Sequence, residues 1–160
     1  MRPWSLPELL ALDIGINGIT PVAAETLAAA LSRGAMPNLM GLILTGNSIG
    51  NRGAAALATP LRKLPALKEL VVADCEIGDE GVASLLANLG KDDFKALWRL
   101  QLNQNRLKDK GCATLVSALD AGGLPKLTQM NVSSNPASAA AVQAVVGAWR
   151  RRGYPGVLGI

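Results

Sequence analysis

One pattern of apolar residues, LxxLxLxxNxL, recurs five times along this 160-residue chain and restricts its possible folds more than any other feature. The copies begin at Leu9, Leu39, Leu67, Leu97 and Leu127, so successive copies are 30, 28, 30 and 30 residues apart. Repeats of this length are typical of solenoids, in which each unit buries its apolar face against its neighbours. The sequence therefore predicts stacked repeats rather than one conventional globular core.

Each copy also predicts a short strand followed by a helix. Two apolar residues separated by a single residue place their side chains on one face of an extended strand. Strands that all run in the same sense need a long crossover, usually a helix. Four apolar positions at helical spacing follow each pattern, and they give that helix one buried face. The last of these positions is filled by Leu31, Leu61, Leu89, Leu119 and Trp149.

This pattern, with glycine and a helix in the second half of each unit, resembles that of the leucine-rich repeat family over essentially the whole chain. The repeat length is most similar to that of the ribonuclease-inhibitor-like subfamily. The resemblance implies an α/β solenoid, or horseshoe, with an inner parallel β-sheet and outer α-helices. We expect residues 1–160 to form a single leucine-rich repeat domain. Its repeats would begin near residues 9, 39, 67, 97 and 127, with a partial sixth repeat from about residue 154.

A column of polar residues just past the strands predicts a ladder of side chains. A side-chain amide at a turn can donate to and accept from the backbone of neighbouring turns, so it satisfies polar groups that would otherwise be buried without partners. Cys75 takes the equivalent position in the third repeat, a substitution that the family pattern allows. The predicted structural ladder is Asn17, Asn47, Cys75, Asn105 and Asn135.

The composition excludes several classes of enzyme. The chain has no histidine, which rules out a Ser-His-Asp triad, a Cys-His pair and a His-ligated zinc site. Its glycines match no phosphate-binding loop, and its two cysteines lack metal-ligand spacing. We therefore expect no enzyme activity, no cofactor and no metal site.

The resemblance implies instead a non-catalytic module that binds another protein through a concave surface. Strand residues that alternate with the core leucines would face that concavity. They are small or apolar in the first three repeats and more polar in the last two. Among them are no tryptophan or tyrosine anchors of the kind found in tight interfaces. The candidate partner-binding residues are Asp13, Ile43, Glu69, Val71, Arg99, Gln101, Asn103, Gln129 and Asn131.

Other functions remain open at this point. Neither end of the chain carries a polar capping segment, so a structural subunit or fragment packed end-on within a larger assembly is one alternative. Three explanations fit such ends: a fragment of a longer array, end-to-end association or docking against another chain, or a complete chain capped by Trp4 and residues 149–154. A GTPase-activating-type regulator, as in the Ran-directed member of the family, is a minor alternative without a matching motif here.

Charge gives a further indication of the partner. The net charge of +4 does not imply nucleic-acid binding unless it is concentrated on one face, and 3% aromatic residues leave few platforms for bases. Arg52, Glu80 and Lys110 alternate in sign at equivalent positions, which predicts charge pairing between repeats. Three arginines at 150–152 complement the end of the last helix, although phosphate or an acidic partner is an alternative there.

Signals for export or membrane insertion are missing from the sequence. The first eight residues include two prolines and an acid where a signal peptide needs an apolar run, and no apolar run approaches the length of a membrane span. We expect a cytoplasmic protein with reduced cysteines, a protein partner, and no nucleic-acid or membrane association.

Overall fold

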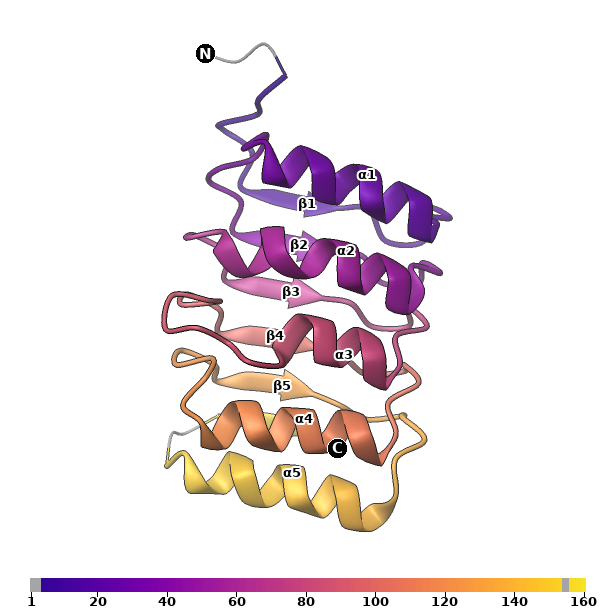
Figure 1. Cartoon of the computed structure of the whole chain (residues 1–160), viewed down its shortest axis with the longest axis vertical. Helices are drawn as coiled ribbons and strands as arrows, with labels where there is room; N and C mark the ends of the chain where they lie inside the picture. Colours follow the sequence, from indigo (N-terminus) through magenta and orange to yellow (C-terminus); the bar gives the residue numbers. More distant parts are fainter. Residues whose placement is uncertain (1–3, 154–155) are drawn as a thin grey trace.

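The computed structural model describes residues 4–153 and 156–160, and within them six parallel strands form one sheet beneath a layer of five helices (Figure 1). The strands pair in sequence order, β1-β2-β3-β4-β5-β6. The predicted α/β solenoid is therefore confirmed. Tyr154 and Pro155, which the predicted partial sixth repeat includes, lie outside the described residues.

The strands are short and stack in an unbroken register. Leu12 pairs with Leu42, Leu42 with Leu70 and Leu70 with Leu100, and the row continues through Met130 to Leu158. The middle residues of this row are buried, because they belong to the core that also contains apolar residues of the helices. The strands are β1 (Ala11–Asp13), β2 (Gly41–Ile43), β3 (Glu69–Val71), β4 (Arg99–Gln101), β5 (Gln129–Asn131) and β6 (Val157–Gly159).

All the helices cover the same face of the sheet and enclose the core between the two layers. The small residues Ala24 and Ala54 are almost fully buried, so their helices approach the neighbouring repeats closely, and Leu57 and Leu115 fill the space above the strands. The helices are α1 (Pro21–Ser32), α2 (Gly50–Lys63), α3 (Asp79–Leu86), α4 (Asp109–Asp120) and α5 (Ala139–Arg151).

Asparagine side chains join the turns after β2, β4 and β5 to the turn of the preceding repeat. Asn105 Oδ1 accepts from the backbone N–H groups of Cys75 and Ile77 at 3.0 Å each, while its Nδ2 donates to the carbonyl oxygen of Val72 at 2.8 Å. Asn47 bonds in the same way to Asn17 and Ile19 of the first repeat. These buried amides satisfy backbone groups that the short strands leave without partners.

Cys75 supplies only part of this arrangement. Its thiol donates to the carbonyl oxygens of Leu44 and Ala73, at 3.2 and 3.3 Å, but it accepts none of the backbone N–H groups of the second repeat that are described. Ile49 N–H bonds within its own turn instead, to Asn47 O. Burial raises the pKa of the Cys75 thiol to about 11, so the thiol remains protonated and can donate at neutral pH.

A second set of side chains, which sequence analysis missed, caps α3, α4 and α5 from the repeat before each of them. Neither Gly78 nor Lys108, the N-cap residues of α3 and α4, makes a side-chain cap bond. Instead Asp79 Oδ1, in α3, accepts from the backbone N–H groups of Lys108 and Gly111, both at 2.8 Å. A Cβ atom at Gly111 would lie 2.5 Å from that oxygen, so glycine is required for the contact. Asn51 caps α3 in the same manner.

Helix α3 ends one turn earlier than its apolar column predicts. The column extends to Leu89, but the helix stops at Leu86 and Asn88 adopts a φ of 53°. Asparagine tolerates this left-handed conformation better than most residues, and it ends the helix. The prediction that Leu89 lies on the helix is therefore wrong, although Leu89 still packs against the core from the loop.

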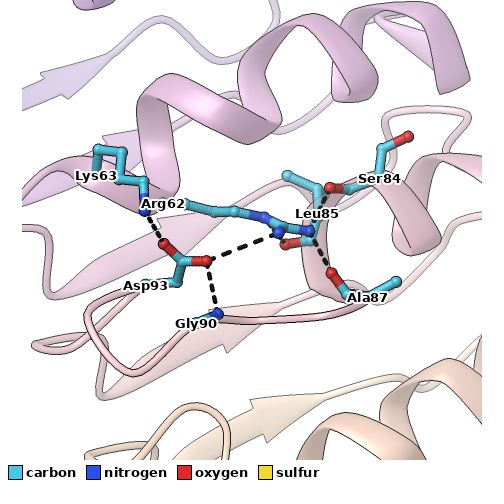
Figure 2. A network of polar contacts seen from close by, with 7 residues as sticks. All are labelled: Arg62, Lys63, Ser84, Leu85, Ala87, Gly90 and Asp93. Carbon is cyan, nitrogen blue, oxygen red and sulfur yellow. Dashed lines mark hydrogen bonds and ion pairs between the residues drawn. The ribbon is translucent and has the colours of Figure 1, made fainter.

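Arg62, from α2, binds the exposed end of α3 (Figure 2). Its Nε donates to Leu85 O at 2.9 Å, and its Nη2 donates to Ser84 O and Ala87 O at 2.7 and 2.9 Å. These carbonyl groups lie in and just past the last turn of α3, where no helical N–H reaches them. The arginine therefore replaces the missing turn and fixes the third repeat against the second.

Asp93 completes this network from the loop that follows α3 (Figure 2). Its side chain is 7% exposed and accepts from Lys63 Nζ at 2.6 Å and from Gly90 N at 2.9 Å, with Arg62 Nη1 at 3.8 Å. Burial opposes ionisation of the carboxyl, but these hydrogen bonds and the two cations outweigh it and lower the pKa of Asp93. Asp93 is therefore ionised in the folded chain at neutral pH.

The ladder predicts a specific loss of stability. We expect Asn105→Ala to lower the free energy of unfolding by about 1–3 kcal/mol, because it leaves buried N–H and C=O groups without partners. Urea denaturation measures the change. Asn103→Ala is the matched control, because its side-chain amide makes only a 3.5 Å contact with Gln104. Equal stability of the two variants would contradict a ladder.

The Asp93 network predicts a dependence on pH. The pKa of Asp93 in the folded chain lies below its ordinary value of 3.8, so its contribution is present above that value and disappears as pH falls through the folded pKa. Asp93→Asn should be less stable than the parent at pH 7, by about 1–3 kcal/mol. Thermal melts from pH 7 to pH 3 should show this difference shrinking. Asp92→Asn, at the exposed neighbouring residue, should show neither effect.

Candidate functional site

The face of the sheet opposite the helices, here called the open face, carries the predicted partner-binding residues in adjacent columns. Strand pairing aligns Glu69 with Arg99 and Arg99 with Gln129 in one column, and Val71 with Gln101 in the next. Asp13 and Ile43 extend the second column toward the first repeat, Asn131 extends it toward the last, and Asn103 follows β4. The candidate residues are all exposed or partly exposed. The fold therefore brings them together on one surface.

The chemistry of the open face changes along the sheet. Ile43 and Val71 give β2 and β3 an apolar surface, whereas Gln101 and Gln129 give β4 and β5 a surface of carboxamides. Asn131 is partly committed to the fold, because its Oδ1 accepts from Ser133 N at 2.9 Å. Asp13 makes the equivalent bond to Gly15 N. The side chains of Gln101 and Gln129 make no such bond among the described residues. They are therefore the side chains best able to form hydrogen bonds with a partner.

Glu69 and Arg99 form an ion pair across β3 and β4. Arg99 Nη1 lies 3.3 Å from Glu69 Oε2, and the two side chains are 39% and 34% exposed. Such a pair contributes little to stability, about 0–1 kcal/mol. Arg99 Nε is buried and has no hydrogen-bond acceptor within the described part of the chain. The guanidinium is thus held in place with donors left over.

A shallow hollow of about 220 Å³ lies beside this arginine on the open face. The carboxamides of Gln101, Gln129 and Asn131, which can both donate and accept hydrogen bonds, line it together with residues of β6. Its lining residues are Arg99, Gln101, Gln129, Met130, Asn131, Val157 and Gly159. The hollow is small for a metabolite but suits a single side chain of a partner.

Trp98 is the aromatic residue that sequence analysis overlooked. It lies directly before β4 and is partly exposed. Its backbone N–H donates to Lys68 O, and its backbone carbonyl accepts from Thr128 N, both at 2.9 Å. The backbone of Trp98 therefore lies between the starts of β3 and β5. No pattern marks this position, because the equivalent residues differ in every repeat. Tryptophan is prominent among the residues that dominate binding energy at interfaces.

The described residues offer little for metal or thiol chemistry. They include no group of three or more Cys, Asp or Glu side chains that could hold a metal ion. Cys112 is buried, and burial, with smaller effects from the charges of Asp109 and Asp79, raises the pKa of its thiol. Among the same residues, none of the helices combines the length and the apolar character needed to cross a membrane.

Comparison with known proteins connects this architecture to a family. A family model described as Leucine Rich repeat matches residues 35–58 and 63–86. NACHT, LRR and PYD domains-containing protein 5 of Homo sapiens is 34% identical over 130 residues, which are 81% of this chain and 10% of that protein. Ribonuclease inhibitor of Sus scrofa is 36% identical over 94 residues, which are 59% of this chain and 20% of that protein.

A solved structure shares the fold. The chain described as Leiomodin-1 Actin-Binding Site 2 superposes with a TM-score of 0.70 at 15% identity, covering 82% of this chain and 75% of that one. This chain spans only a tenth to a fifth of the length of its curated relatives. The repeat register, the leucine row and these matches agree: the chain belongs to the leucine-rich repeat proteins of the ribonuclease-inhibitor-like type.

Proposed function

We propose that the chain is a non-catalytic module that binds a protein partner through the open face of β2 to β5. The observation that carries this proposal is the contiguous row of Glu69, Arg99 and Gln129, whose side chains are partly exposed and contribute nothing to the core. Two similar proteins have names that point the same way: one is an inhibitor of a ribonuclease, and the other is an actin-binding site.

The two halves of the open face would have different tasks in such a complex. Ile43 and Val71 supply apolar area, whereas Gln101 and Gln129 pair with polar groups of the partner. Arg99 is held by Glu69 through Nη1 at the boundary, and its side chain is 39% exposed, so a partner carboxylate or carbonyl can reach the outer part of the guanidinium. Since arginine is common among binding hot spots, Arg99 is the residue we expect to matter most.

A second candidate function is the packing of the first repeat against another repeat or another chain. Ile16 has a φ of 53° and is 83% exposed. Both properties are unfavourable for a β-branched apolar residue, and the equivalent positions hold Gly46, Asp74, Gln104 and Ser134. Leu10 and Val22, in the same repeat, are also more than half exposed. A contact that covers Ile16 would explain why such a residue occupies this turn.

For the open face, the expected result is loss of partner capture when Arg99 and Gln101 are both replaced by Ala. The double variant should recover at least about tenfold less partner in affinity purification with quantitative mass spectrometry, because two central contacts are removed. The matched control replaces Arg106 and Gln143, which are exposed but lie off the open face. Equal recovery by both variants would move the binding site elsewhere.

For the first repeat, Ile16→Asn separates conformation from contact. Asparagine tolerates the left-handed turn, so the variant should be as stable as the parent or more stable by up to about 1 kcal/mol. If the first repeat packs against another chain, light scattering should show a larger particle for the parent than for this variant. A monomeric parent that binds its partner as well as the variant does would exclude the packing role.

A further inference from the structure

Charge is sorted between the two edges of the sheet. The strand-start edge comprises the ends of the helices and the segments that lead from them into the next strand, on the left of Figure 1. Its ten basic residues are Arg33, Arg62, Lys63, Lys68, Lys91, Lys95, Lys126, Arg150, Arg151 and Arg152. Its four acidic residues are Glu8, Asp92, Asp93 and Asp120. This edge is therefore strongly basic.

The helix-start edge, where strands lead into helices, has the opposite balance. Its basic residues are Arg52, Arg106, Lys108 and Lys110. Its acidic residues are Asp13, Glu25, Asp74, Glu76, Asp79, Glu80 and Asp109. The modest net charge of +4 thus conceals a separation of charge across the sheet. A field of this shape attracts acidic partners to one edge and orients them.

Part of the basic charge is used within the fold. Arg62 binds the end of α3, Lys63 pairs with Asp93, and Arg151 pairs with Asp120. Arg152 donates to the carbonyl groups of Gly123 and Leu124. Five exposed cations of this edge have no ion pair within 4.0 Å among the residues that the structure describes: Lys68, Lys91, Lys95, Lys126 and Arg150.

Lys68, Lys95 and Lys126 lie in the segments that lead into β3, β4 and β5, and Trp98 lies in the segment that leads into β4. Lys68 and Trp98 occupy equivalent positions on adjacent strands and share a backbone hydrogen bond. Lys95 precedes the tryptophan by three residues, and Lys126 lies just before the strand on its other side. Strand spacing of about 4.8 Å places these cations within reach of successive residues of one extended segment.

We propose that this part of the strand-start edge, Lys68, Lys95, Trp98 and Lys126, binds an acidic polypeptide segment of a protein partner. The proposal rests on the proposed function and specifies the chemistry of the partner. Lysines would face carboxylates of the segment, and Trp98 would contact an apolar side chain between them. The edge adjoins Arg99 on the open face, so one partner can occupy both surfaces.

The arrangement favours a polypeptide over a nucleic acid. A single partly exposed tryptophan gives one stacking position, whereas binding to single strands uses a series of them. Asp92 and Glu69 also interrupt the cations, which disfavours a continuous row of phosphates. An acidic segment with an apolar residue matches this mixture.

Charge reversal on the two edges tests the proposal. The probe is a fluorescein-labelled oligoglutamate peptide with one central leucine, and binding is followed by fluorescence anisotropy at low salt. Lys68→Glu with Lys126→Glu should weaken binding at least about tenfold, because local repulsion replaces attraction. Lys108→Glu with Lys110→Glu is the matched control: it changes the net charge equally on the other edge, and binding should change less than about twofold.

Three results would overturn the proposal: no binding of the peptide, equal weakening by both double variants, or equal competition by single-stranded DNA. Trp98→Ala should weaken binding of the leucine-containing peptide and leave an all-glutamate peptide nearly unaffected. If charge reversal impairs folding, Lys68→Gln with Lys126→Gln replaces it. The Arg99 and Gln101 variant reports the open face separately, so loss of capture there, without any peptide binding at the edge, would reject only the acidic segment.

Discussion

Each turn that follows a strand buries backbone amides and carbonyls that strands of only three residues cannot pair, and the whole array depends on side chains from neighbouring repeats to satisfy them. Asn47 and Asn105 reach back to the preceding turn. Asp79 does the same for the start of the following helix. Because one set acts at the turns and the other at the helix starts, the fourth and fifth repeats are each fixed to the preceding repeat at two points.

The sequence determines most of this scaffold through its period. The leucine row, the order of the strands and the positions of the asparagines follow from one repeated unit, because stacked copies place equivalent residues side by side. The end of α3 could not be predicted in this way. Leu89 fits the apolar column, and the arginine that replaces the missing turn comes from another repeat. Helix caps contributed by the preceding repeat were missed for the same reason, since caps are normally sought within the local sequence.

The binding surfaces were only partly accessible to this reasoning. Alternation along a strand identifies which residues face away from the core, so the members of the open face could be named from sequence. Their importance for binding could not be inferred from sequence, because the residues at these positions differ from repeat to repeat and form no pattern. Trp98 and the basic edge became visible only when strand pairing placed Lys68 and Thr128 on either side of the tryptophan, with Lys126 two residues before Thr128. The separation of charge also complements the helices, whose N-terminal ends favour acids and whose C-terminal ends favour bases.

Cys75 has a consequence for cooperativity along the array. A thiol donates where an asparagine would both donate and accept, so the turns of the second and third repeats share fewer bonds than the turns on either side. Asn51 and Arg62 hold this junction from the helix layer instead. In a linear stack, coupling between neighbours decides how far unfolding spreads. We expect the coupling between these two repeats to depend on the helix layer, so that unfolding passes from one to the other only when the contacts of Arg62 are lost.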